Sequence, residues 1–158
     1  MVLLVQYTLI FASVLALVAL GGCFSEHSGV INIGLEGIMV MGALGGALAM
    51  KFLPATTPGI VLFILIVLAS VLVGMAFSLL LGFAAIHFNA DQTLVGTALN
   101  LMGTAAAVVI VRAINVAENP DNVSSTVVYR QAKQVFLVKI GDFEFNWFML
   151  IIVLAIIA

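Results

Sequence analysis

Long runs of apolar residues constrain this sequence more than any other feature. Four complete runs, bounded by charged or turn-forming residues, follow one another along the chain, and a fifth is still apolar at the last residue. A helix rises about 1.5 Å per residue, so about 20 residues cross the roughly 30 Å hydrocarbon layer of a bilayer. The runs predict transmembrane helices at about residues 5–24, 33–52, 59–87 and 91–112, and a truncated helix at residues 147–158.

The composition excludes a water-soluble globule. Apolar residues make up 65% of the chain and charged residues 8%, against about 45–50% and about 25% in soluble domains. With five Lys and Arg and a net charge of −2, the chain also lacks the basic patch that binding to a nucleic-acid backbone requires. We therefore expect an all-α, polytopic transmembrane helix bundle, in which residues 1–158 form one partial domain, the N-terminal portion of a longer membrane protein.

The one long polar stretch, at about residues 113–146, is expected to form a single extramembrane loop. It holds three of the five basic residues and four of the seven acidic ones. Its latter half, residues 135–147, alternates around Gly141 and Asp142, which is typical of a β-hairpin, with Trp147 as an interfacial anchor. An irregular loop is the open alternative.

Small residues recur at spacings that let helix backbones approach one another. In the run at 59–87 such a residue occurs at every fourth position, and the run at 33–52 contains a similar pair. These stripes predict close helix packing in a compact bundle. Chance placement in an Ala- and Gly-rich sequence is the alternative for any single stripe. The predicted packing residues are Gly42, Gly46, Ser70, Gly74, Ser78 and Gly82.

Polar side chains inside the apolar runs are candidates for a solute pathway, because they are costly in hydrocarbon and usually face a protein interior or an aqueous path. One face of the run at 91–112 carries Thr93, Thr97, Asn100 and Thr104, with Gly96 and Gly103 nearby. We expect this face to line the route of a polar, uncharged solute. Alternatively, the hydroxyls bond carbonyls of their own helix and Asn100 bridges to a neighbouring helix.

Glu36 is a second kind of candidate, since it is a carboxylate placed early in an apolar helix. It follows a glycine-flanked turn at residues 29–34. The carboxylate is either part of the pathway or is stabilised by the helix dipole at the membrane boundary.

The sequence contains no recognisable catalytic or metal-binding pattern. His27 and His87 are isolated from any second ligand at metal-binding spacing, and no phosphate-binding GxxxxGK[ST] motif occurs. We expect a protein that is not an enzyme, with no catalytic residue and no metal site.

Two motifs resemble one family. The stretch at residues 25–39, SEHSGVINIGLEGIM, resembles the N-terminal signature of permease subunits of bacterial ABC importers for nucleosides, ribose-type sugars and branched-chain amino acids. It is most similar to the nucleoside type. About 60 residues later, a second stretch resembles the G-x-A-L-N-L helix of the same subunits, through Thr93, Val95, Gly96, Ala98, Leu99, Asn100 and Leu101.

The resemblance implies a transmembrane permease subunit of an ATP-driven, binding-protein-dependent importer in the bacterial cytoplasmic (inner) membrane, for nucleosides or a related polar solute. The implied partners are a second permease subunit, identical or different, two cytoplasmic ATPase subunits and an external solute-binding protein. ATP would be bound by the ATPases, so no cofactor is expected on this chain. Asn32, Glu36 and Asn100 become the pathway positions within the two motifs.

Orientation is where charge and resemblance disagree. The excess of Lys and Arg would place the turn at Lys51 and the long loop in the cytoplasm, whereas the resemblance implies that both are external. We follow the resemblance. A non-transporting membrane scaffold or assembly subunit is the alternative function. A secondary transporter ranks third, because those proteins usually carry several intramembrane charges.

Overall fold

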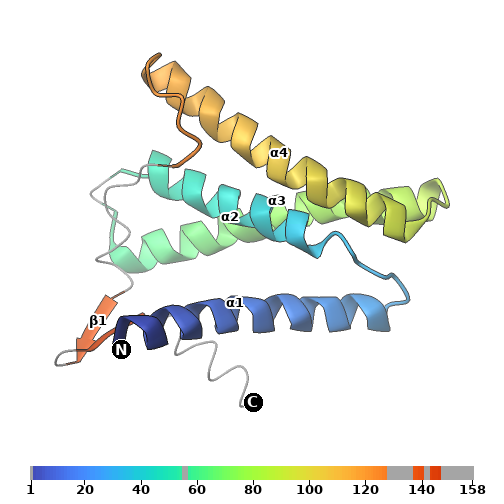
Figure 1. Cartoon of the computed structure of the whole chain (residues 1–158), viewed down its shortest axis with the longest axis horizontal. Helices are drawn as coiled ribbons and strands as arrows, with labels where there is room; N and C mark the ends of the chain where they lie inside the picture. Colours follow the sequence, from blue (N-terminus) through green and yellow to red (C-terminus); the bar gives the residue numbers. More distant parts are fainter. Residues whose placement is uncertain (1, 55–56, 128–136, 141–142, 147–158) are drawn as a thin grey trace.

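Four long helices dominate the computed structural model, which describes residues 2–54, 57–127, 137–140 and 143–146. The helices run back and forth along the long axis of the molecule (Figure 1). Each is long and apolar enough to cross a membrane, which confirms the prediction of a polytopic helical bundle. The elements are α1 (Val2–His27), α2 (Leu35–Phe52), α3 (Gly59–His87), α4 (Gln92–Glu118), β1 (Leu137–Ile140) and β2 (Phe143–Asn146).

The connection between α1 and α2 differs from the expected boundaries on both sides. Helix α1 continues to His27, beyond the expected end at residue 24, because the Ser28 N–H donates to the carbonyls of Phe24 and Ser25 at 3.3 and 3.0 Å. A turn follows in which Gly29 has a φ of +83°, a conformation that glycine adopts without strain. Helix α2 begins at Leu35, later than the expected residue 33.

Helix α3 has the expected bounds, but its N-terminus is built differently. A Thr-Pro pair before a helix is typical of a Thr cap with Pro as the first helical residue, but Thr57 and Pro58 are arranged otherwise. Pro58 is itself the N-cap, and the Thr57 hydroxyl donates to the Pro54 carbonyl at 2.8 Å. The hydroxyl therefore closes the preceding turn and leaves the helix without a side-chain cap.

Helix α4 begins as expected and ends later than expected. The Asp91 carboxylate accepts from the N–H groups of Thr93 and Leu94 at 2.8 and 3.3 Å, a favourable arrangement at a helix N-terminus. The helix then passes Arg112, where we expected it to end, and continues to Glu118. Arg112 is exposed, and its long stem lets a charge leave the helix surface without ending the helix. The polar loop thus begins at residue 119 and not at residue 113.

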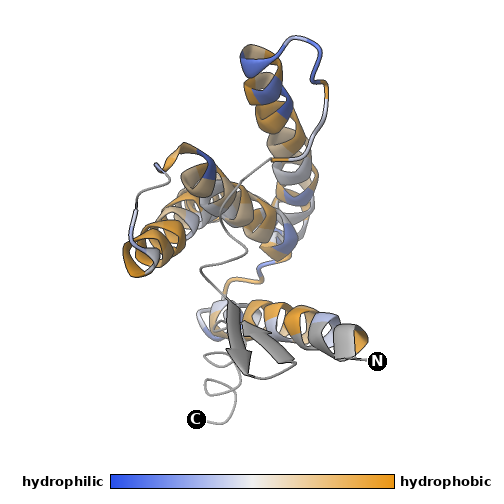
Figure 2. Cartoon of the chain, turned by 90° about the vertical axis from the view of Figure 1, so that its left-hand side faces the viewer, coloured by the Kyte–Doolittle hydropathy of each residue, from blue (hydrophilic) through white to orange (hydrophobic). Residues whose placement is uncertain are grey.

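The described helices bury few side chains and leave most apolar side chains exposed. Phe77, Leu81 and Leu99 form a small buried cluster between α3 and α4, with Ile38 of α2 packed against it. Figure 2 shows hydrophobic colouring along much of each helix, with hydrophilic colouring at loops and at several places along α4. Exposed faces of this kind suit contact with lipid or with other helices.

The described part of the long loop contains the predicted hairpin. Strands β1 and β2 pair antiparallel, with Leu137 opposite Asn146 and Ile140 opposite Phe143. Trp147 and the truncated helix at residues 147–158 lie outside the described residues, so those two predictions stay untested.

Candidate functional site

The N-terminal end of α2 lies against α4 with the two backbones almost touching. A Cβ added to Gly37 would lie 2.9 Å from the Asn100 Cα, and one added to Gly103 would lie 2.9 Å from the Gly37 Cα. On the other side of Gly37, a Cβ on Gly96 would lie 2.9 Å from the Gly34 nitrogen. Any side chain here would force the helices apart. We call this region, residues 31–37 with residues 92–103, the α2–α4 joint.

The side-chain amide of Asn100 bridges the joint, with its oxygen and its nitrogen each bonded to a backbone group at the start of α2. Its Oδ1 accepts from the Gly37 N–H at 2.7 Å, and its Nδ2 donates to the Ile33 carbonyl at 2.9 Å. Helices are usually capped by the side chain of their own N-cap residue. The N-cap of α2 is Gly34, which has no side chain, so Asn100 caps α2 from the neighbouring helix.

Side chains also bond other backbone groups of the turn before α2. The Gln92 Oε1 accepts from the Ile31 N–H at 2.8 Å, and the Ser25 hydroxyl donates to the Val30 carbonyl at 2.9 Å. Hydrocarbon offers no hydrogen bonds, so non-helical backbone at membrane depth must be satisfied by protein or by cavity water. Helices α1 and α4 provide those partners here.

The predicted threonine face of α4 is exposed, and its hydroxyls bond within the helix. The Thr97 hydroxyl donates to the Thr93 carbonyl at 2.8 Å, and the Thr104 hydroxyl donates to the carbonyls of Asn100 and Leu101 at 3.0 Å. This is the bonding that the alternative interpretation expected. The hydroxyl oxygens keep acceptor capacity toward the exposed face, and their part in a pathway stays a prediction.

Two of the predicted pathway residues have oxygen atoms without partners in the described part of the chain. Glu36 lies in the first turn of α2 and is exposed, and its carboxylate makes no hydrogen bond or ion pair there. The Asn32 Oδ1 is buried and also unpaired among the described residues. The α2–α4 joint therefore has unpaired hydrogen-bond acceptors on Asn32 and Glu36, while the oxygen and the nitrogen of the Asn100 amide are each already bonded.

The predicted small-residue stripe of α3 contacts α2 over only part of its length. A Cβ on Gly42 would lie 3.3 Å from the Ser70 carbonyl oxygen, and one on Gly74 would lie 3.8 Å from the Gly42 Cα. Gly46 packs against the Ser70 hydroxyl. Further along α3, the Ser78 hydroxyl bonds the Met75 carbonyl at 2.9 Å.

Gly82, the last residue of the stripe, meets nothing within 4 Å in the described structure. Sequence reasoning overlooked Gly45, where a Cβ would lie 2.9 Å from the Val73 Cβ. It also overlooked the close approach of Gly37. The available signal was spacing, since Gly34 and Gly37 are three residues apart, as are Gly42 and Gly45.

A polar cluster that the sequence analysis did not anticipate joins the other ends of α2 and α4. The Lys51 ammonium lies 3.0 Å from a Glu118 carboxylate oxygen and donates to the Asn115 Oδ1 at 3.3 Å. The Nδ2 of Asn115, a residue only 2% exposed, donates to the carbonyls of Ser124 and Thr126 at 2.9 and 3.0 Å. We call Lys51, Asn115 and Glu118 the end cluster. Its one sequence signal was a helical i, i+3 spacing of Asn115 and Glu118.

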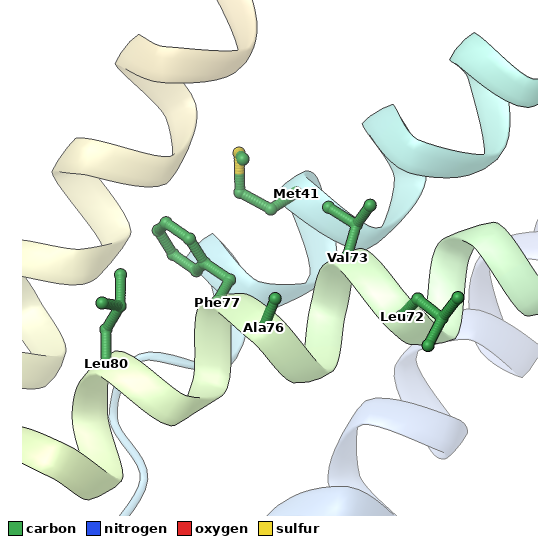
Figure 3. A pocket seen from close by; sticks show the side chains of 6 residues that line it. All are labelled: Met41, Leu72, Val73, Ala76, Phe77 and Leu80. Atoms are coloured by element: carbon green, nitrogen blue, oxygen red, sulfur yellow. The ribbon is translucent and has the colours of Figure 1, made fainter.

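A shallow apolar hollow of about 360 Å³ lies on the surface of α3 next to α2. Figure 3 shows its lining side chains. They are Met41 of α2 with Leu72, Val73, Ala76, Phe77 and Leu80 of α3. These side chains offer no donor or acceptor for a hydroxylated solute, so we place no solute there.

Comparison with known proteins gives matches to transport permeases. The family described as branched-chain amino acid transport system / permease component matches residues 4–158. The guanosine ABC transporter permease protein NupQ of Bacillus subtilis is 45% identical over 116 residues, 71% of this chain and 35% of that protein. The nucleoside ABC transporter permease protein NupC of Lactococcus lactis is 36% identical over 110 residues, 70% of this chain and 34% of that protein.

Another relative has a different solute in its name. The putative glucose ABC transporter permease protein TsgC13 of Haloferax volcanii is 37% identical over 101 residues, 64% of this chain and 29% of that protein. The chain spans about a third of the length of the curated relatives that it matches. No solved structure matches it.

Proposed function

The chain belongs to the family of branched-chain amino acid transport system permease components, and from that premise we propose that it is part of the permease subunit of an ATP-driven nucleoside importer. The observation that carries the proposal is its 45% identity to a guanosine permease over 71% of the chain. The chain is part of a multi-pass membrane protein. ATP is bound and hydrolysed by separate subunits, so the permease has no enzymatic role.

The α2–α4 joint supports the proposal chemically. A nucleoside is polar and carries hydroxyl groups and often an amino group, all of which donate hydrogen bonds. Exposed acceptors are available on both helices, from the Glu36 carboxylate of α2 and from the threonine hydroxyls of α4. The proposed pathway residues are Asn32, Glu36, Thr93, Thr97 and Thr104, with Asn100 beside them.

The proposed assembly follows from the importer role. The subunit pairs with a second permease subunit, identical or different, in the bacterial cytoplasmic membrane. ATPase subunits bind on the cytoplasmic side and a solute-binding protein delivers nucleoside from outside. The largely exposed apolar faces of α1 and α3 provide surface for lipid and for the second permease subunit.

The orientation of the chain is a separate proposal. The C-terminal ends of α2 and α4 lie together at one end of the bundle (Figure 1), and we assign that end to the outside. Cysteines at Ser124 and Ser125, in a Cys23→Ser background, should react with a membrane-impermeant thiol reagent in spheroplasts, while a cysteine at Ala90 should not. The reverse labelling pattern would overturn the assignment.

Transport is tested with the complete system. Proteoliposomes containing the full-length subunit, its partner permease and the ATPases, supplied with the binding protein, should accumulate guanosine, adenosine or cytidine only when ATP is present. Ribose and glucose serve as competing solutes, and liposomes without ATP or without binding protein are the controls. If the assembled complex moves none of the nucleosides, the proposed substrate class is wrong; if it moves no solute at all, the scaffold alternative is favoured.

A further inference from the structure

Helix length places Asn100, though not the whole α2–α4 joint, inside the apolar span of α4. Helix α4 has 27 residues and is therefore about 40 Å long, longer than the roughly 30 Å hydrocarbon layer. Asn100 lies eight residues after Gln92, about 12 Å along the helix axis. Because Gly37 bonds Asn100 directly, α2 begins at that depth. Figure 1 shows α2 starting well inside the end of the bundle at which α3 passes into α4.

This depth gives the Glu36 carboxylate an unusual position. It is exposed, and it has no hydrogen-bond or ion-pair partner in the described part of the chain. A carboxylate at such a depth is costly against lipid and is found facing a protein interior or a water-filled path. The first turn of α2 favours its negative charge through the helix dipole, so the local structure accommodates an ionised group there.

Asn100 bonds the backbone on both sides of Glu36. It accepts from Gly37, the residue after Glu36, and donates to Ile33, three residues before it. The first turn of α2 is thereby held against α4, and the direction of the residue between the two bonds is held with it. The Asn100 amide has one N–H left for any other group, so it is poorly suited to bind solute itself.

We propose that Asn100 is a positioning residue, which holds the Glu36 carboxylate in a water-accessible part of the pathway, where that carboxylate accepts hydrogen bonds from solute hydroxyl or amino groups. The proposal deepens and rests on the proposed nucleoside transport. Asn100 acts through Glu36 and Glu36 contacts the solute, so losing either should remove the same interaction.

A double-mutant cycle tests this dependence, with nucleoside flux per assembled complex as the measurement. Glu36→Gln and Asn100→Ala should each lower the flux about tenfold, and the double variant should also lose only about tenfold, because both changes remove one interaction. A loss of about a hundredfold in the double variant would mean independent roles and would overturn the proposal. Ser78→Ala is the matched control, since its hydroxyl bonds only a carbonyl of its own helix, and it should leave every flux in the cycle unchanged.

A labelling experiment tests the same proposal without any need for transport. Glu36→Cys in a Cys23→Ser background should react with a water-soluble thiol reagent in membrane vesicles, and adding Asn100→Ala should change the rate several-fold while Ser78→Ala does not. The positioning role is overturned if the cysteine reacts from neither side of the membrane, or if Asn100→Ala leaves its labelling rate unchanged. Guanosine should slow the reaction. If guanosine has no effect and the wild-type complex carries no nucleoside, the proposed solute fails, whereas a rate that depends on Asn100 still supports the positioning role.

Discussion

Helices α2 and α4 meet at both of their ends, and the two contacts use different chemistry. At the joint, glycine backbones touch and a neutral amide, Asn100, bridges them. At the end cluster, a charged pair, Lys51 and Glu118, closes the contact over the buried Asn115. Solvent access explains the difference: water can solvate the ion pair at the end of the bundle, whereas a charged bridge enclosed between the two helix backbones of the joint would be costly.

The largest effect is expected where backbones touch. Gly37→Leu or Gly103→Leu would drive a side chain into the backbone of the other helix, so either should destabilise the bundle by about 3 kcal/mol, the upper part of the overpacking range. Thermal stability and the monodisperse fraction in detergent are the measurements. Gly82→Leu is the control, since nothing lies within 4 Å of Gly82 in the described structure. Wild-type stability of Gly37→Leu would show that the joint is looser than described.

The next effect comes from the amide bridge. Asn100→Leu leaves the Gly37 N–H and the Ile33 carbonyl without partners, which should lower the free energy of unfolding by about 2 kcal/mol. Thr104→Val removes a hydroxyl that bonds only its own helix and should change stability by less than about 0.5 kcal/mol. Thermal unfolding in nanodiscs separates the two. Equal losses would contradict the bridging role of Asn100.

Replacing Asn115 should lower stability somewhat less than replacing Asn100 does, but it should loosen the loop that follows α4. Asn115→Leu removes the donor to the Ser124 and Thr126 carbonyls, at an expected cost of about 1–2 kcal/mol. Hydrogen exchange at residues 119–127 should accelerate, because those residues lose their attachment to α4. Asn100→Leu, which changes the opposite end, should leave exchange in that segment unaltered. If both variants accelerate it equally, the two contacts are not independent.

The smallest effect is expected from the ion pair. Glu118 is 57% exposed, so Glu118→Gln should cost about 0.5 kcal/mol, within the range of surface pairs. The cost should shrink at high salt, since solvent-exposed charges are screened. The loss caused by Asn100→Leu should not depend on salt. A salt-independent loss for Glu118→Gln would show that the Lys51–Glu118 pair is shielded from the solvent, contrary to the exposure of Glu118.

The presence of the four helices and of the hairpin could be predicted from the local sequence pattern. The residues at which the helices end could not always be predicted. An apolar run marks what fits in lipid, but helical bonding continues past it, as at His27 and Glu118. Charge misled the prediction at Arg112, because a long side chain can carry its charge away from the helix. The polar face of α4 was recognised, yet its bonding favours the structural alternative for Asn100.

By itself, the sequence determined that this protein crosses a membrane repeatedly as helices, because a long apolar segment in lipid must satisfy its backbone internally. It also marked Glu36 and Asn100 as residues that lipid would not tolerate without a reason. Only the tertiary structure decided what Asn100 does, since its partners Ile33 and Gly37 lie 67 and 63 residues away. Those bonds form only where glycines on two helices let the backbones meet, and that approach depends on the packing of both surfaces together.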